Sequence, residues 1–199
     1  MARITLKDNP VNTCGDLPAV GTKAPDFLLT RTDLTDFSLA DLAGKMVIMN
    51  IFPSIDTAVC ALSVRTFNKK IVEFPNTVLL AVSLDLPFAH QRFCETAGIE
   101  NVVSASELRN RKFGDAYGLR MIDGPLAGLL ARAVIIMDET GTVRYTQLVP
   151  EIAREPDYEE VFDALKKAMA ETDACLQSET AEQARTSSSD EPCDDGRAG

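Results

Sequence analysis

The stretch from Met46 to Phe74 constrains the fold of this chain more than any other part of it. Its first segment, 46–52, is dominated by apolar and β-branched residues, as in a strand that is buried on both faces. Pro53 ends that run, because proline cannot donate a hydrogen bond within a central strand. From Ala58 onward, apolar residues recur with helical spacing. The pattern predicts a buried strand, a short turn and a helix packed on one side.

Cys60 lies in the first turn of this predicted helix, and Thr57 is the candidate N-cap. The first turn of a helix has backbone N–H groups without partners and the positive end of the helix dipole, and both favour the thiolate form of a cysteine. The edge beyond the carboxyl ends of strands is also where open α/β sheets place their sites. Free cysteines are nevertheless commonly buried and inert. Position alone therefore leaves both a reactive thiol and a small core residue open.

The remaining chain shows strands that alternate with helices. We expect strands at 3–7, 11–13, 27–30, 36–39, 77–84, 102–104, 132–138 and 143–148. Helices are expected at 38–45, 87–97, 107–117 and 157–169. The first two strands would form an N-terminal β-hairpin, and the last two a second hairpin. This order predicts an α/β protein with a thioredoxin-like fold, in which a central mixed sheet is flanked by helices.

Negative charge is concentrated at the carboxyl end. Residues 171–199 hold eight of the 30 Asp and Glu residues but only two basic residues, and they contain few large apolar side chains. We therefore expect one domain over residues 1–170 and a disordered acidic tail over 171–199. The net charge of −10 argues against nucleic acid or an anionic membrane as a partner. No apolar run suits a secretory signal or a membrane span, so we expect a cytoplasmic protein.

Pro53, Thr57 and Cys60 reproduce the P-x-x-x-T-x-x-C active-site loop of the peroxiredoxins. The string PSIDTAVCALSVRTFN and the segment DGPLAGLLARAVIIMDETG at 123–141 resemble the thiol peroxidase (Tpx-type) branch, which consists of atypical two-cysteine peroxiredoxins. The resemblance covers most of residues 2–169. It implies a peroxiredoxin-type fold and a thiol-specific peroxidase that reduces hydrogen peroxide and organic hydroperoxides without a metal or other cofactor, in antioxidant defence.

The resemblance also assigns roles to particular residues. The Cys60 thiolate would attack a hydroperoxide oxygen and become a sulfenic acid. Negative charge on the departing oxygen calls for donors, and the candidates are the Thr57 hydroxyl, the Cys60 N–H and an arginine. Arg132 matches the family's active-site arginine and begins a buried strand, where a charge is unexpected, whereas Arg65 is the other candidate. Pro53 would shield the sulfur from water.

Cys94 matches the resolving cysteine of this branch, the thiol that attacks the sulfenic acid. It would form an intrachain, redox-active disulfide with Cys60, which thioredoxin would reduce. The two cysteines lie on different predicted helices, so at least one helix end must unwind for them to bond. The resemblance further implies a homodimer.

Other residues and other functions stay open from the sequence. Cys14 is expected to be structural or incidental, and Cys175 and Cys193 fall in the predicted tail. His90, one helical turn before Cys94, could tune that thiol, but a solvated helix residue is the commoner case and is expected here. The alternatives to a peroxidase are a redox sensor without turnover on the same fold, a cysteine hydrolase with His90 as its only available base, and a structural module without chemistry.

Overall fold

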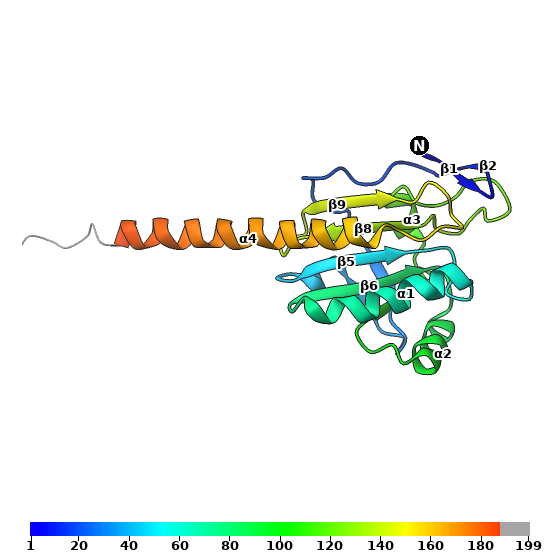
Figure 1. Cartoon of the computed structure of the whole chain (residues 1–199), viewed down its shortest axis with the longest axis horizontal. Coiled ribbons are helices and arrows are strands. Elements are labelled where there is room, and N and C mark those ends of the chain that lie inside the picture. The colour runs from blue at the N-terminus through cyan, green and yellow to red at the C-terminus, as the bar shows by residue number, and fades with distance from the viewer. Residues whose placement is uncertain (188–199) are drawn as a thin grey trace, which may run out of the picture.

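A computed structural model describes residues 1–187 of the chain, and its side chains as far as residue 172. A seven-stranded mixed sheet has the order β4-β3-β7-β6-β5-β8-β9. Figure 1 shows β9, β8, β5 and β6 side by side in that sheet. Its strands are β3 Leu28–Thr30, β4 Asp36–Ser38, β5 Met46–Ile51, β6 Thr77–Ser83, β7 Val103–Ser106, β8 Ala133–Met137 and β9 Val143–Leu148. A separate hairpin at the N-terminus pairs β1 Arg3–Leu6 with β2 Asn9–Asn12.

Within residues 1–187, four α-helices and two short 3₁₀ helices accompany the strands. They are η1 Leu39–Leu42, α1 Ala58–Lys70, η2 Ile71–Glu73, α2 Pro87–Ala97, α3 Lys112–Ala116 and α4 Tyr158–Ser187. The helix-flanked mixed sheet and the N-terminal hairpin confirm the architecture predicted from the sequence. Within the described residues, no helix combines the length and the apolar character that crossing a membrane requires.

The direction of the central strands decides which loops meet. β5 runs parallel to β6, with Ile51 opposite Val82, and antiparallel to β8, with Ile51 opposite Ala133. The carboxyl ends of β5 and β6 and the amino end of β8 therefore lie at one edge of the sheet. Residues just beyond Ile51 and just before Ala133 become spatial neighbours, although they are distant in sequence.

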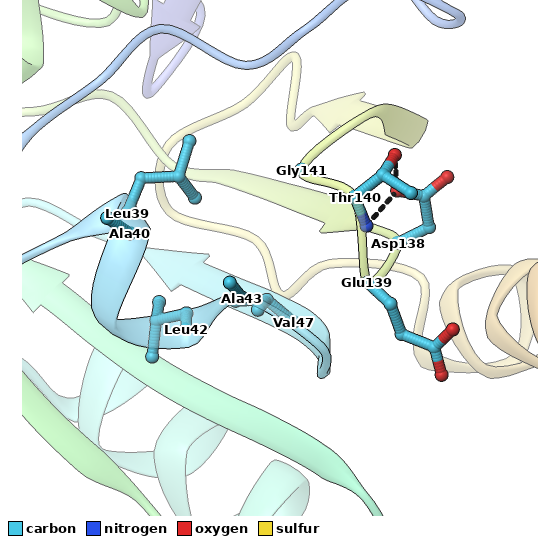
Figure 2. A pocket seen from close by; sticks show the side chains of 9 residues that line it. All are labelled: Leu39, Ala40, Leu42, Ala43, Val47, Asp138, Glu139, Thr140 and Gly141. Carbon is cyan, nitrogen blue, oxygen red and sulfur yellow. Dashed lines mark hydrogen bonds between the residues drawn. The ribbon is translucent and has the colours of Figure 1, made fainter.

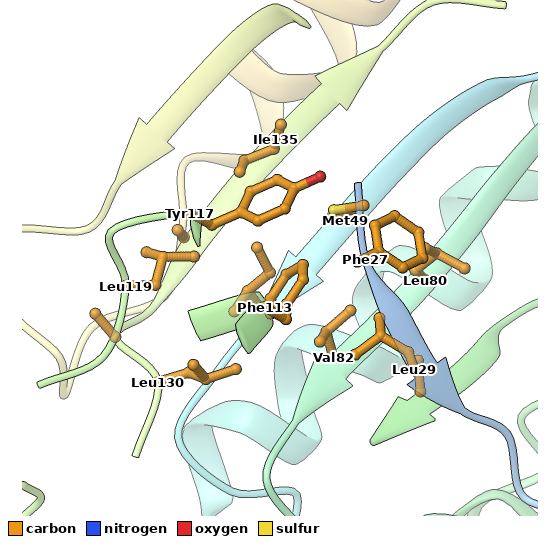
Figure 3. Close-up of a cluster of buried hydrophobic side chains, with 14 of the residues drawn as sticks. Phe27, Leu29, Met49, Leu80, Val82, Phe113, Tyr117, Leu119, Leu130 and Ile135 are labelled. Carbon is orange, nitrogen blue, oxygen red and sulfur yellow. The ribbon is translucent and has the colours of Figure 1, made fainter. Parts of the chain in front are cut away.

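Side chains of the sheet alternate between two apolar layers, as pleating requires. On one face Met49 joins a cluster with Phe27, Phe113 and Tyr117, the last two from α3 and the residue that follows it (Figure 3). On the other face Ile48 and its neighbours pack against α1 and α4. The core thus forms on both sides of β5, which confirms its prediction as a strand buried on both faces.

Two helix predictions were wrong at their boundaries. The helix expected at 107–117 begins only at Lys112, because Glu107 turns inward, where it pairs with Arg120 and accepts a hydrogen bond from the Gly114 N–H. Burial raises the pKa of Glu107 despite these partners. The final helix was expected to end near Met169, but α4 continues to Ser187. The prediction of an acidic disordered tail over 171–199 stays a prediction, and its residues 188–199 lie outside the described part.

Gly118 offers a test of the packing between the N-terminal segment and the helical layer. Its φ is +68°, and a Cβ there would overlap the backbone of Asp16. We expect Gly118→Ala to lower the free energy of unfolding by roughly 3 kcal/mol or more, since neither backbone segment can yield easily. Gly44→Ala is the matched control. Gly44 has a φ of +77° with nothing within 4 Å of the added carbon, so only the conformational cost of about 1–2 kcal/mol applies. Equal losses in urea denaturation would contradict the prediction.

Candidate active site

The loop between β5 and α1 carries the first three predicted site residues. Pro53 is buried two residues beyond the end of β5. Thr57 has the extended backbone of an N-cap, as predicted, but its hydroxyl donates to the Ser54 carbonyl oxygen at 3.1 Å and makes no capping bond. The first-turn N–H groups of α1, including that of Cys60, are therefore not capped by a side chain and can donate to a ligand.

Cys60 meets Arg132 at the edge where β5 ends and β8 begins. The Cys60 side chain is completely buried, and Arg132 Nη2 donates a hydrogen bond to its sulfur at 3.3 Å. Arg132 Nε donates to the Ile152 carbonyl oxygen at 3.1 Å, which fixes the plane of the guanidinium. Its Nη1 is buried and has no acceptor among the residues the structure describes. One edge of this buried cation thus contacts the thiol, and the two N–H bonds of Nη1 are left for a ligand.

The other arginine considered from the sequence lies elsewhere. The Arg65 guanidinium sits over the Phe93 ring, 5.0 Å from its centroid, and so joins α1 to α2. Arg132 is therefore the arginine that contacts the sulfur of Cys60.

A cavity of about 220 Å³ leads to Arg132. Its walls come from the hairpin, the loop before α1 and two later loops. They are formed by Leu6, Pro53, Ser54, Thr57, Ala58, Val59, Leu126, Leu129, Arg132, Ile152 and Ala153. The lining is apolar apart from the groups at Arg132, Thr57 and Ser54. A small ligand with a polar head and an apolar body would fit, with its head at the guanidinium.

A second cavity of about 230 Å³ lies between η1 and the β8–β9 turn, beside Val47 near the start of β5 (Figure 2). Its one buried carboxylate, Asp138, accepts hydrogen bonds from Thr140, Thr142 and Arg144. Burial acts to raise the pKa of Asp138, but these hydrogen bonds prevail and hold it below its usual range. The oxygens of the Asp138 carboxylate are thus already hydrogen-bonded, so this cavity offers no reactive group comparable to Cys60 beside Arg132.

Cys94 lies on α2, half-buried, with its sulfur 3.4 Å from Ser104 Oγ. It packs against the small apolar cluster to which Cys60 belongs. Both thiols are free, so the structure represents the dithiol state. Cys14 is also free, and its sulfur lies 3.6 Å from the Gly114 carbonyl oxygen. The side chains of Cys175 and Cys193 lie outside the described residues.

The prediction for His90 was wrong. Its side chain is only 1% exposed, and Nε2 lies 2.9 Å from Ser83 Oγ. The helix faces inward at this position, because His90 packs beside Phe52, with ring centroids 6.2 Å apart. Sequence reasoning also missed Asp85, which binds the loop before α1. The signal was present, since Asp85 follows a buried strand that runs parallel to β5 and so reaches the same edge of the sheet.

Glu151 anchors the hairpin beside the cavity. Lys7 and Asp8 form the two-residue loop between β1 and β2 with positive φ values of 51° and 65°, as such tight hairpins require. The Glu151 carboxylate accepts hydrogen bonds from both of their N–H groups, from Thr5 Oγ1 and from the Ala153 N–H. These bonds, that from Ala153 foremost, lower the pKa of Glu151 to about 2. The same carboxylate therefore fixes the hairpin and the loop that supplies the Ile152 carbonyl to Arg132.

We expect Glu151→Gln to lower the urea midpoint of unfolding at pH 7. Because the pKa of Glu151 is lowered in the folded state, its contribution is complete above the ordinary glutamate value of about 4.3 and is lost as the pH falls towards about 2. The difference in urea midpoint between wild type and variant should become smaller as the pH falls over that range. Glu100→Gln, which removes the same charge from an exposed site, is the control. A difference independent of pH would contradict the role assigned to the carboxylate.

Comparison with known proteins places the chain in a family. Residues 19–162 match the Redoxin family model. The thiol peroxidase of Mycobacterium tuberculosis is 54% identical over 165 residues, which cover 83% of this chain and 99% of that protein. The crystal structure of a peroxiredoxin-like protein from Aquifex aeolicus has a TM-score of 0.80 and 39% identity, over 84% of this chain and 98% of its own. A thiol peroxidase from Chromobacterium violaceum shares the fold, with a TM-score of 0.78 at 22% identity over 85% and 98% of the two chains. The chain therefore belongs to the Redoxin family and, within it, to the thiol peroxidases.

Proposed function

We propose that this thiol peroxidase reduces hydrogen peroxide and organic hydroperoxides, with Cys60 as the peroxidatic cysteine and Cys94 as the resolving cysteine. The observation that carries the proposal is the hydrogen bond from a buried arginine, Arg132, to the buried sulfur of Cys60. A guanidinium beside a sulfur favours the thiolate, which is the nucleophile. No bound metal or organic cofactor is needed for this chemistry.

The reaction begins when a hydroperoxide enters the cavity and its terminal oxygen approaches Cys60 Sγ. The sulfur forms a bond to that oxygen while the O–O bond breaks, and the sulfenic acid remains on Cys60. The departing oxygen carries the electron pair of the broken bond and takes up a proton, to leave as an alcohol or water. Arg132 Nη1, which has no acceptor within the described structure, and the uncapped N–H groups of α1 are placed to stabilise that charge.

Thr57 and Pro53 support the same step in different ways. The Thr57 hydroxyl donates to Ser54, so its oxygen can accept a hydrogen bond from a protonated peroxide. Pro53 is buried and forms part of the cavity wall, where it limits access of water to the sulfur. The mainly apolar walls, with Leu126 and Leu129 among them, suit an organic hydroperoxide as well as hydrogen peroxide.

In the second step the Cys94 thiolate attacks the sulfenic sulfur. An S–S bond forms, the S–O bond breaks and the oxygen leaves as water after protonation. Both thiols are free in the described state and Cys60 is fully buried, so the cysteine-bearing segments must move before they can bond. Reduced thioredoxin would then return both thiols, and the oxidant would have been removed as part of antioxidant defence. We also propose that the protein acts in the cytoplasm as a homodimer.

One equivalent of hydrogen peroxide, followed by non-reducing peptide mapping, tests the assignment. A rapid Cys60–Cys94 bridge is expected, and Cys60→Ser should abolish the oxidation whereas Cys14→Ser should not. If Cys60 stays reduced while other thiols react, the proposed chemistry is wrong. Continuous peroxide consumption in the presence of NADPH, thioredoxin reductase and thioredoxin separates the enzyme from a redox sensor, which would oxidise once and stop.

A further inference from the structure

Asp85 ties the loop that precedes the peroxidatic helix to the end of β6. Its Oδ1 accepts a hydrogen bond from Ser54 Oγ at 2.8 Å, and its Oδ2 accepts from the Ile55 N–H at 2.7 Å. Oδ2 also accepts from Ser83 Oγ at 2.7 Å. The carboxylate therefore receives three donors, two of them from the segment that leads into α1.

His90 extends this arrangement to α2. Ser83 gives its only proton to Asp85, so the 2.9 Å contact between Ser83 Oγ and His90 Nε2 requires that the imidazole donate. A continuous series of hydrogen bonds thus runs from His90 through Ser83 and Asp85 to the loop at Ser54. His90 Nδ1 is buried and has no partner within the described residues, which makes Nε2 the only functional donor of the ring.

This series joins the two parts of the chain that disulfide formation must bring together. α2 carries His90 and, one helical turn later, Cys94, while the loop held by Asp85 leads directly into the helix of Cys60. We propose that His90, Ser83 and Asp85 are positioning residues that hold α2 against the peroxidatic loop in the dithiol state, and that their hydrogen bonds break when Cys94 pairs with Cys60. The inference rests on the proposed Cys60–Cys94 disulfide.

The charge state of His90 makes this arrangement sensitive to pH. Burial lowers the pKa of His90, against the opposing effects of Asp85 and of Asp56, which itself pairs with Arg92 at 2.9 Å. A protonated ring would also carry a buried N–H at Nδ1 without an acceptor. Because the pKa is lowered, the buried neutral ring contributes fully to the stability of this arrangement above the ordinary histidine value of about 6.5, and that contribution is lost as the pH falls through the lowered pKa. Acid therefore favours release of α2.

His90 is the only histidine of the chain, so a tag-free sample gives the signals of one imidazole in a proton NMR titration. The full-length protein is titrated as the dithiol and again after one equivalent of hydrogen peroxide, with the disulfide mapped on the same sample. We expect His90 to titrate at lower pH in the dithiol form than in the disulfide form. If His90 titrates equally in both forms although the Cys60–Cys94 bridge is mapped, this inference is overturned while the proposed disulfide stands. If the map shows no such bridge, the proposed resolving role fails, and this inference fails with it.

Two variants separate positioning from general packing. His90→Gln keeps an N–H donor for Ser83 but cannot titrate. The protection of α2 amides from hydrogen exchange in the dithiol form should therefore no longer decrease below pH 6.5, as we expect it to do in the wild type. Ser83→Ala interrupts the series, and we expect several-fold faster exchange in α2 and several-fold faster disulfide formation. Persistence of the acid effect in His90→Gln, or unchanged rates in Ser83→Ala, would contradict the proposed positioning role.

Discussion

Arg132→Met is expected to slow the oxidation of Cys60 by hydrogen peroxide by about 10²–10³-fold, the usual effect of removing one donor that stabilises developing charge. Methionine fills a similar volume but provides neither the cation beside the sulfur nor the N–H bonds left open at Nη1. Arg132→Lys should restore little, because one ammonium group cannot hold the Ile152 carbonyl, the Cys60 sulfur and a peroxide oxygen together. The chain has no tryptophan, so the rate is best followed by quenched flow with thiol alkylation and mass spectrometry.

Arg65→Met is the matched control for that experiment. It also removes one positive charge, but the Arg65 side chain stacks on Phe93 and does not contact the Cys60 sulfur. Its oxidation rate should stay close to that of the wild type, and circular dichroism should show that both variants are folded. A rate for Arg132→Met equal to that of Arg65→Met would contradict the role of Arg132 in the reaction.

Cys94→Ser is expected to abolish continuous turnover with thioredoxin while the first equivalent of peroxide is still consumed. The serine can keep the hydrogen bond to Ser104, so the dithiol-state packing of α2 should survive. The Cys60 sulfenic acid then has no resolving thiol, and excess peroxide should convert it to the sulfinic acid. Mass spectrometry of Cys60 after a single turnover and after an excess of peroxide measures both outcomes.

The same assay on Cys14→Ser, Cys175→Ser and Cys193→Ser tests the other thiols. Each should retain turnover. If Cys94→Ser turns over normally and one of these variants does not, the resolving cysteine has been assigned to the wrong position, although Cys60 keeps its role.

The fold could be predicted where the apolar pattern was continuous. The runs that became β5 and β8 are buried across their length and β6 is buried from Leu79 onward, and such strands depend on composition rather than on distant partners. The helix predicted over 107–117 was wrong at its start. The local pattern is helical, but Glu107 turns inward to pair with Arg120. A long-range ion pair leaves no trace in local periodicity. The predicted end of α4 was also wrong. The helix continues past Met169, beyond the residues that pack against the sheet.

The candidate site divides in a similar way. Pro53, Thr57 and Cys60 lie within one short segment, and Arg132 stands directly before a buried strand. The segment and the arginine could therefore both be recognised in the sequence. The structure places these groups together, but their catalytic roles stay predictions. The Ile152 carbonyl could not be foreseen, because any residue offers a carbonyl and only the loop geometry directs it to Arg132. The orientation of His90 likewise depends on Ser83, which no helical pattern reveals.

The walls of the cavity at Arg132 and its reactive groups come from different kinds of structure. Cys60 lies in a helix and Arg132 immediately precedes a central strand, whereas Leu126, Leu129 and Ile152 belong to loops and Leu6 to the end of the hairpin. Loops tolerate exchange far better than buried strands do. Selectivity among peroxides of different bulk can therefore be redesigned, or diverge in evolution, through the loop side chains without disturbing the reacting sulfur and its guanidinium.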